Sequence, residues 1–201
     1  MTIQDVIDDA NAGELSQVSA TEQDILSYIN LGLIELYKRF SLRWEEAIVT
    51  MRQDKTVYKL DGTDSNVEIS SDINTIAEVY DENGASLPIN SETEALSINT
   101  PTWNTIQVPY PSEGDKLSVI YTAPPERVTD PTDKLTIPST LLEALLHYVG
   151  YRAHGSINGN IDGENNTHYV RFEKSCDDVT KRGLVTTDDM TNHDIKDKGF
   201  V

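Results

Sequence analysis

The feature that most constrains the fold is a change in the spacing of apolar residues, which occurs at Trp44 and is reversed at Pro138. Between Ile25 and Phe40, apolar residues recur every three or four positions, which is the spacing of an amphipathic helix. From Trp44 onward, short segments rich in Val, Ile, Thr and Tyr are separated by turn residues, which is typical of antiparallel strands. Helical spacing returns at Pro138, so we expect a β-domain inserted between helices.

Helices are predicted on both sides of this β-domain. Residues 3–12 carry apolar side chains at helical spacing. Thr21 followed by Asp24 resembles a capping box in which Asp replaces Glu, so a second helix is expected to begin there. Pro138 suits the first turn of a third helix, and Gly183 suits the C′ position that ends a fourth.

The strand segments are short and fall between turn residues. Asp81-Glu82-Asn83-Gly84 predicts a hairpin turn, because Asn and Gly tolerate the positive φ that such turns require. The expected strand segments are residues 44–51, 56–60, 66–70, 75–80, 105–110 and 116–122.

The predicted fold class is α+β: a four-helix bundle with a small antiparallel β-domain inserted between helices two and three, plus an extended C-terminal tail. Neither helix pair can bury its apolar stripe alone, so the two pairs are expected to form one bundle. The expected domains are the N-terminal helices of the bundle (1–43), the β-domain (44–123), a Pro-rich linker (124–137), the C-terminal helices of the bundle (138–183) and a flexible tail (184–201).

The expected core of the bundle combines apolar residues from both helix pairs. Its members are Leu33, Leu36, Leu142, Leu145 and Phe172.

The charge is strongly negative and unevenly distributed. Sixteen Lys and Arg stand against 34 Asp and Glu, a net charge of -18, and no Lys or Arg precedes Lys38. Specific nucleic-acid binders bring positive charge to phosphates, so direct DNA binding is not expected. The charge fits either a solubilising surface or a wall past which DNA slides, and composition leaves both open. No apolar run approaches the roughly 20 residues of a membrane span, and the first residues show no secretory signal.

Two metal sites are conceivable near the third and fourth helices, and neither is expected. Residues 158–163 match the first positions of an EF-hand loop, but the twelfth position falls on Tyr169, which has no carboxylate. His147, His154 and His168 could together hold zinc, yet the spacing of the first two is not the commoner i, i+4 spacing. We expect no required cofactor, and no calcium or zinc binding tighter than about millimolar.

Catalytic signatures are not found in the sequence. There is no GxSxG, Walker or GxGxxG motif and no catalytic Cys–His pattern. The single Cys176 lies on an apolar stripe and cannot form an internal disulfide, so we expect a small core residue in a chain folded under reducing conditions. The sequence does not predict an enzyme.

Three segments resemble head-to-tail adaptor (connector) proteins of tailed bacteriophages, particularly the podovirus form known as tail tubular protein A or gatekeeper. They are YINLGLIELYKRF in the second helix, RWEEAIVTM at the start of the β-domain and IPSTLLEALLHYVGYRAHGSI at the return to helix. The resemblance is architectural and spans most of the chain. Its most similar part is the C-terminal helix pair, with Tyr148, Tyr151, Arg152, Tyr169 and Phe172.

The resemblance implies a structural virion protein in the neck, assembled in the host cytoplasm. Such adaptors form a closed, typically dodecameric ring that joins the portal protein to the tail nozzle or tail tube. The ring lines the channel through which DNA passes without specific binding, and no membrane takes part. The resemblance also implies a place in the ring interface or in the bundle for five residues: Tyr148, Tyr151, Arg152, Tyr169 and Phe172.

The tail, residues 184–201, is implied to clasp the portal protein. Its composition is too polar for a fold of its own, so it is expected to order only on a partner. The residues expected to bind the portal are Asp188, Asp189, Asp194 and Asp197, which would select a basic groove, and Phe200 and Val201, which would anchor the end.

An alternative reading is a tail accessory β-module that binds carbohydrate or a tail protein. Trp44, Trp103 and Tyr110 are its candidate stacking residues, although a place in the core is the more ordinary role for Trp44. An enzyme with an unusual site is the third reading.

Overall fold

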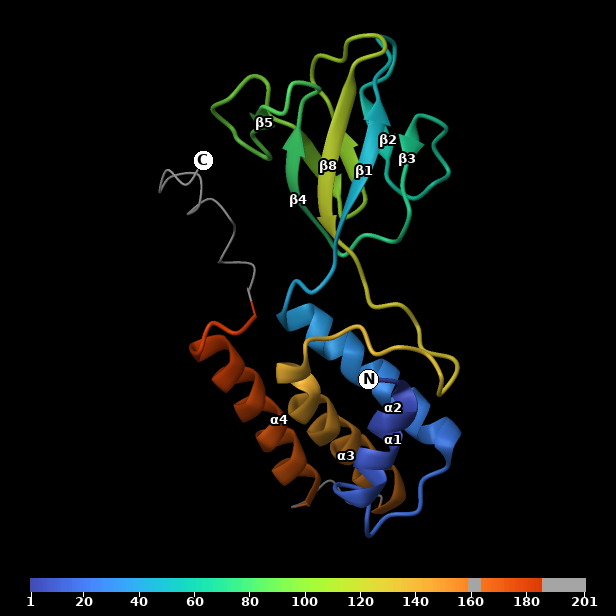
Figure 1. The fold of residues 1–201 in the computed structure, drawn as a ribbon. Helices are drawn as coiled ribbons and strands as arrows, with labels where there is room; N and C mark the ends of the chain where they lie inside the picture. Colours follow the sequence, from blue (N-terminus) through green and yellow to red (C-terminus); the bar gives the residue numbers. More distant parts are fainter. Residues whose placement is uncertain (159–163, 186–201) are drawn as a thin grey trace. The chain divides into compact units, whose positions relative to one another are not determined.

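The computed structural model describes residues 1–158 and 164–185 of the 201-residue chain. The chain divides into two compact units (Figure 1). The helical unit comprises Met1–Ser41 and the chain from Pro125 onward, and the β unit comprises Leu42–Pro124. Within the described ranges, none of the helices has the length and apolar character needed to cross a membrane.

Capping residues define where the first two helices begin. Thr2 and Thr21 each accept a hydrogen bond from the backbone N–H three residues on, and the Asp at that position accepts one in return. The capping box predicted at Thr21 and Asp24 is therefore confirmed, and Gly183 has the predicted positive φ of 62°. The helical unit contains α1 (Ile3–Ala12), α2 (Glu22–Arg39), the 3-10 turn η1 (Ser139–Leu141), α3 (Leu142–Asn158) and α4 (Glu164–Lys181).

The prediction of a four-helix bundle is wrong. Helix α3 packs against each of the other helices, and α4 packs mainly against α3 (Figure 1). Helix α1, with 10 residues, is too short to form a full side of a bundle. The helices are thus arranged around α3 and do not enclose a common core as four equal members. Periodicity revealed which face of each helix is buried, but it carried no information about which neighbour covers that face.

Four of the five residues expected in the bundle core are buried within the helical unit. Leu33, Leu36, Leu145 and Phe172 are buried, whereas Leu142 is only half-buried. Leu141 is completely buried instead. It belongs to η1, whose tighter winding shifts the phase of the side chains by one position relative to a continuous α-helix.

The Pro-rich segment after the β unit is fixed to the helical unit by hydrogen bonds. The Asn30 side chain donates to the Val128 carbonyl and accepts from the Val128 N–H, both at 2.8 Å. At the start of α1, the N–H groups of Ile3 and Gln4 donate to the carbonyls of Asp133 and Pro131. These bonds satisfy helix-end donors that would otherwise lack partners.

The β unit spans nearly the residues predicted for it, but it contains more strands than the six predicted segments. Its described strands form two antiparallel sheets, one in the order β3-β1-β8-β4-β5 and the other β2-β7-β6. This extensive β structure also contradicts the predicted fold class, in which the β-domain was a minor part. The strands are β1 (Trp44–Thr50), β2 (Val57–Lys59), β3 (Val67–Glu68), β4 (Thr75–Tyr80), β5 (Ser86–Leu87), β6 (Asn99–Thr102), β7 (Thr105–Gln107) and β8 (Lys116–Thr122).

Both sheets contribute to one apolar core. Alternate residues of β8, namely Leu117, Val119 and Tyr121, are buried together with Tyr58 of β2 and Ile106 of β7. This alternation is the period that predicted the strands. The sequence did not predict β5, which has only two residues, or β6, which contains a proline and lies at a sheet edge where proline is tolerated. The turn predicted at Asp81–Gly84 joins β4 to β5, with Gly84 at φ 79°.

Candidate functional site

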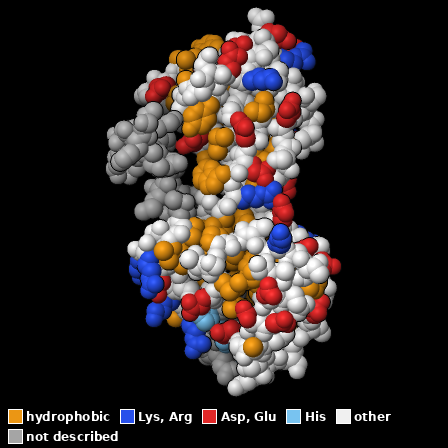
Figure 2. Space-filling view, in the orientation of Figure 1, with side chains coloured by type: hydrophobic (Ala, Val, Ile, Leu, Met, Phe, Trp, Pro, Cys, Tyr) orange, Lys and Arg blue, Asp and Glu red, His pale blue; other side chains and the backbone are white. Residues whose placement is uncertain are grey.

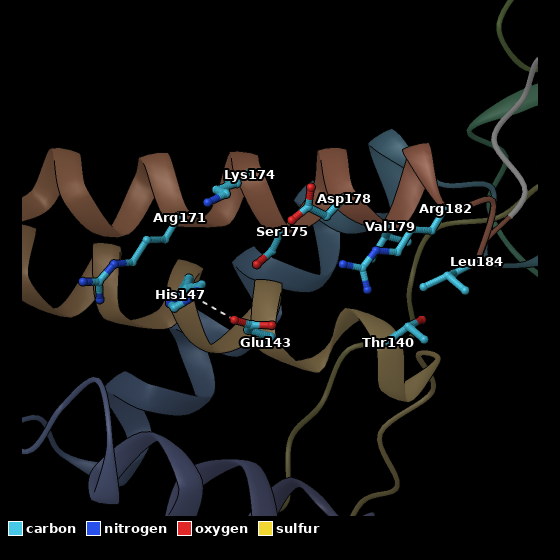
Figure 3. A pocket seen from close by; sticks show the side chains of 10 residues that line it. All are labelled: Thr140, Glu143, His147, Arg171, Lys174, Ser175, Asp178, Val179, Arg182 and Leu184. Carbon is cyan, nitrogen blue, oxygen red and sulfur yellow. Dashed lines mark ion pairs between the residues drawn. The ribbon is translucent and has the colours of Figure 1, made fainter.

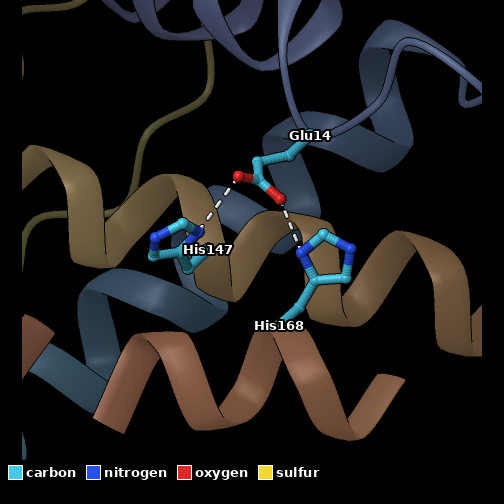
Figure 4. A group of neighbouring side chains, drawn as sticks. All are labelled: Glu14, His147 and His168. Carbon is cyan, nitrogen blue, oxygen red and sulfur yellow. Dashed lines mark ion pairs between the residues drawn. The ribbon is translucent and has the colours of Figure 1, made fainter. Parts of the chain in front are cut away.

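A group of titratable side chains gathers where three separate segments of the helical unit meet. Glu14 lies in the turn after α1, His147 on α3 and His168 on α4 (Figure 4). Nδ1 of His147 is 3.1 Å from one carboxylate oxygen of Glu14, and Nδ1 of His168 is 2.5 Å from the other. One donor atom from each of the three residues lies within 4.8 Å of the others. We call these residues the Glu14 cluster.

Of the three histidines suggested by the sequence, two belong to this cluster. His154 instead stacks on His168, with ring centroids 4.7 Å apart, and its Nε2 lies 3.0 Å from the backbone carbonyl oxygen of Glu14. Sequence reasoning missed Glu14, because it lies far along the chain from the histidines in a turn that has no helical or strand period. The EF-hand-like residues 159–163 lie outside the described residues.

The Glu14 cluster is largely shielded from solvent. The Nδ1 atoms of both His147 and His168 are buried, and neither makes a hydrogen bond of normal geometry despite its closeness to Glu14. Burial lowers the pKa of His168 below its usual value, while the nearby Glu14 carboxylate acts in the opposite direction. His168 therefore favours the neutral form, in which one ring nitrogen has a free lone pair.

A basic pocket of about 610 Å³ lies beside this cluster, between α3 and α4 (Figure 3). Three exposed cations, Arg171 and Lys174 of α4 and Arg182 just after it, line the pocket together with Glu143 and Asp178. Figure 2 shows Lys and Arg side chains gathered along one edge of the helical unit. In a chain with a net charge of -18, these cations mark the pocket as a candidate surface for an acidic partner.

Four of the five residues predicted for the ring interface or bundle form one aromatic cluster between α3 and α4. Ring centroids are 5.2 Å apart for Tyr148 and Phe172 and 5.1 Å apart for Tyr151 and Tyr169. Tyr148 and Phe172 are buried, whereas Tyr169 is 37% exposed. Arg152 is exposed on α3. Tyr148 and Phe172 therefore pack within the protomer, whereas Tyr169 and Arg152 are exposed and can contact a partner.

An ion pair links α2 to α4 at the edge of this aromatic cluster. The guanidinium of Arg39 donates to both carboxylate oxygens of Glu173 and lies 4.9 Å from the ring centroid of Phe172. The hydrogen bonds from Arg39 lower the pKa of Glu173. Such bidentate pairs fix geometry as well as charge, so Arg39 and Glu173 hold α4 in register with α2.

The remaining candidate residues are dispersed or lie outside the described part of the chain. Cys176 is buried, as predicted, and burial raises the pKa of its thiol to about 11, so it is no thiolate nucleophile at neutral pH. The tail residues expected to bind the portal, Asp188, Asp189, Asp194, Asp197, Phe200 and Val201, lie outside the described residues.

The three aromatic residues considered for ligand stacking are exposed on different elements of the β unit. Trp44, for which a core position was expected, is 43% exposed at the start of β1, so that expectation is wrong. Trp103 lies in the turn between β6 and β7, and Tyr110 follows β7. Since β1 and β7 belong to different sheets, the structure gives no support for a single stacking site.

Comparison with known proteins gives a family for almost the whole chain. None of the curated proteins compared with the chain matches it. A family model described as SU10 adaptor protein matches residues 1–193, which include both units. This agrees with the resemblance to phage adaptors, whereas the particular likeness to podovirus tail tubular protein A gains no support from the match. The chain therefore belongs to the SU10 adaptor protein family and is a structural adaptor of the phage type.

Proposed function

We propose that this protein is a head-to-tail adaptor whose copies form a ring between the portal protein and the tail nozzle or tail tube. Membership of the adaptor family is the observation that carries this proposal. The ring lines the channel through which DNA passes, and the protein belongs to the neck of the virion. A virion joint of this kind needs binding surfaces rather than catalysis.

The division into two units supports separate contacts. The helical unit carries the aromatic cluster and the basic pocket, so we assign it to packing between copies around the channel. The β unit has sheet edges at β3, β5, β2 and β6, and exposed strand edges can pair with another protein. We assign the β unit to the next component of the tail.

Opposite charges on one unit support a ring contact between copies. Helix α1 exposes Asp5, Asp8 and Asp9, and α4 exposes Arg171 and Lys174. A head-to-tail contact that repeats around a ring joins two different surfaces of the same protein, so the surfaces must complement each other. The acidic α1 of one copy facing Arg171 and Lys174 of the next meets this requirement. Tyr151, Arg152 and Tyr169 extend the proposed contact on the α3 and α4 side.

The negative charge also fits the proposed channel. Phosphates are repelled by carboxylates, so an acidic lumen lets DNA pass without holding it. Residues 184–201 are proposed to clasp the portal protein, with their Asp residues facing basic groups and Phe200 and Val201 as the apolar end.

Electron microscopy of the protein mixed with portal-bearing heads tests the proposal. We expect a ring of density at the portal vertex. Deleting residues 184–201 should leave the Tm of the isolated protein nearly unchanged and abolish attachment to the heads. If the full chain forms no ring on portals, the adaptor role is contradicted. If the truncated chain still attaches with unchanged affinity, only the assignment of the clasp is wrong.

Charge reversal tests the contact between copies separately. The double variant Arg171→Glu/Lys174→Glu should lose ring formation, and adding Asp8→Lys/Asp9→Lys should restore it, because the reversed pairs are again complementary. Ring formation by the first double variant at the affinity of the wild type would contradict this contact.

A further inference from the structure

We propose that the Glu14 cluster is a binding site for a divalent transition-metal ion of the zinc class, with Glu14, His147 and His168 as ligands. Two imidazole nitrogens and one carboxylate oxygen form a ligand set that zinc takes in proteins, with a water in the fourth position. The expectation of no zinc site rested on sequence patterns of the histidines, and it did not include Glu14. The proposal is independent of the adaptor role.

The first observation in favour of a metal site is a pair of buried nitrogen atoms. Nearly all buried polar atoms in folded proteins have a hydrogen-bond partner. The Nδ1 atoms of His147 and His168 are buried without one, and both face the Glu14 carboxylate. A metal ion that accepts lone pairs from both nitrogens and from the carboxylate would satisfy all three groups at once.

The donor atoms are close to the separation that one ion requires. Two ligands at about 2.1 Å from zinc stand roughly 3.4 Å apart in a tetrahedral arrangement. The three donors lie within 4.8 Å of one another, so the widest pair must close by up to about 1.4 Å on binding. Nδ1 of His168, 2.5 Å from a Glu14 oxygen, must instead move about 0.9 Å away from that oxygen. Glu14 can supply most of this movement, because it lies in a turn and not in a helix (Figure 4).

Neighbouring groups support the ligands as outer partners of a metal site do. Metal-bound histidines usually turn their second ring nitrogen toward a carboxylate or carbonyl. Nε2 of His147 lies 3.7 Å from Glu143 Oε1 (Figure 3). His154 stacks on His168 and contacts the backbone carbonyl oxygen of Glu14, so it restrains both ligands.

Gly150 leaves space for the Glu14 cluster against the backbone of α3. A Cβ atom at this position of α3 would stand 3.0 Å from Nδ1 of His168 and 3.2 Å from a carboxylate oxygen of Glu14. Glycine inside a helix costs about 1 kcal/mol relative to alanine. The close approach of Glu14 and His168 to the α3 backbone depends on this residue.

An entry path and the local charge are also consistent with a cation. A pocket of about 440 Å³ is lined by Glu14, His154 and His168, so an ion can reach the ligands from solvent. Arg171 also lines this pocket and opposes a cation, but Glu14 and Glu143 bring two carboxylates to the ligands. With neutral histidines, these two carboxylates balance the charge of a bound dication, and Arg171 leaves one positive charge beside the site.

Titration of the untagged full chain with Zn²⁺ tests the proposal by calorimetry. We expect one ion per chain with micromolar or tighter affinity, release of protons on binding, and a higher Tm in the presence of the ion. Co²⁺ gives a second readout, because a tetrahedral site develops strong visible absorption. Binding no tighter than millimolar in the wild type would overturn the proposal and leave Glu14 as an ion-pair partner of the two histidines.

Variants locate the site. Glu14→Gln and His147→Gln keep side chains of similar size, and each should weaken Zn²⁺ binding at least tenfold and remove the Co²⁺ absorption. Glu143→Gln should weaken it about tenfold, as loss of an outer partner does. Glu22→Gln, at an exposed position at the start of α2, is the matched control and should keep the one-ion stoichiometry and the Co²⁺ absorption. If His154→Gln abolishes binding while His147→Gln preserves it, the assigned ligand set is wrong.

Discussion

The two units of the protein bury different kinds of groups. The core of the β unit is apolar, and its buried tyrosines use their hydroxyls in hydrogen bonds, as Tyr58 does with Arg52 and Lys55. The helical unit instead brings Glu14 and two histidines together between its helices. A core with satisfied polar groups has one stable arrangement, whereas a titratable cluster responds to protons and ions. We therefore expect a metal ion to act mainly on the helical unit.

The same comparison applies to surface charge. The helical unit has only acidic charges on α1 and a group of cations at the pocket beside α4, and the bidentate pair of Arg39 and Glu173 links α2 to α4. The sheet edges of the β unit present backbone groups instead. The helical unit thus offers electrostatic contacts, and the β unit offers hydrogen bonding along a strand.

The largest expected effect comes from truncating one core residue in each unit. Leu145→Ala in α3 and Ile106→Ala in β7 should each cost about 2–5 kcal/mol of unfolding free energy, because both side chains are completely buried. We expect each change to act on its own unit, which hydrogen exchange of peptides from the two units would show. Equal loss of protection in both units after either change would contradict the separation of the cores.

The next effect concerns a buried hydroxyl of the β unit. Tyr58→Phe removes the group that accepts from the Arg52 N–H and donates to the Lys55 carbonyl, both at 2.8 Å. Two backbone groups lose their partner, so we expect a loss of about 1–3 kcal/mol in chemical denaturation. Tyr110→Phe, at a 69% exposed position, is the control and should be nearly neutral. Equal stability of the two variants would show that the Tyr58 hydroxyl contributes little.

A smaller effect tests the contact between α2 and α3. A Cβ atom at Gly32 would stand 2.6 Å from Cδ1 of Leu145 and 3.2 Å from Cδ1 of Tyr148. Gly32→Ala should cost about 1 kcal/mol net, because overpacking costs ~1–3 kcal/mol and alanine regains about 1 in helix propensity. Ser27→Ala, at an exposed position of the same helix, should change stability by less than about 0.5 kcal/mol in the same denaturation experiment. A stabilised Gly32→Ala variant would mean that α2 and α3 can separate without cost.

The last prediction concerns acid and the β unit. Hydrogen bonds from Ser70, Ser71, Arg43 and Tyr121 lower the pKa of Glu45 to about 2, from an ordinary value of 4.5. A carboxyl with a lowered pKa stabilises the fold above its ordinary pKa, and this contribution is lost as pH falls from about 4.5 to 2. Glu45→Gln should therefore make stability less dependent on pH across this range.

The measurement can be confined to the β unit, because both tryptophans, Trp44 and Trp103, lie there. Tryptophan fluorescence during denaturation at several pH values would follow this unit. Glu92→Gln, at an exposed position, is the control and should keep the pH dependence of the wild type. If the unfolding free energy depends on pH equally in the wild type and in Glu45→Gln, Glu45 is not a source of acid sensitivity.

The local elements of both units follow from short stretches of the sequence. The change of period at Trp44 placed the strands, and Thr21 and Asp24 marked the start of α2. The turn after β4 was set by residues that accept positive φ, as Gly84 shows. These features depend on residues a few positions apart, so their physical causes are contained in short segments. Only weak elements were missed, such as the two-residue β5 and the proline-containing β6.

Tertiary structure alone decided the arrangement of the helices and the composition of the candidate site. The central position of α3, the replacement of Leu142 by Leu141 in the core and the joining of Glu14 to His147 and His168 all depend on contacts between distant segments. Periodicity shows that a face is buried but not what covers it. A polar cluster formed by a turn and two helices leaves no periodic pattern, because each member is separated from the others by tens to more than a hundred residues of chain.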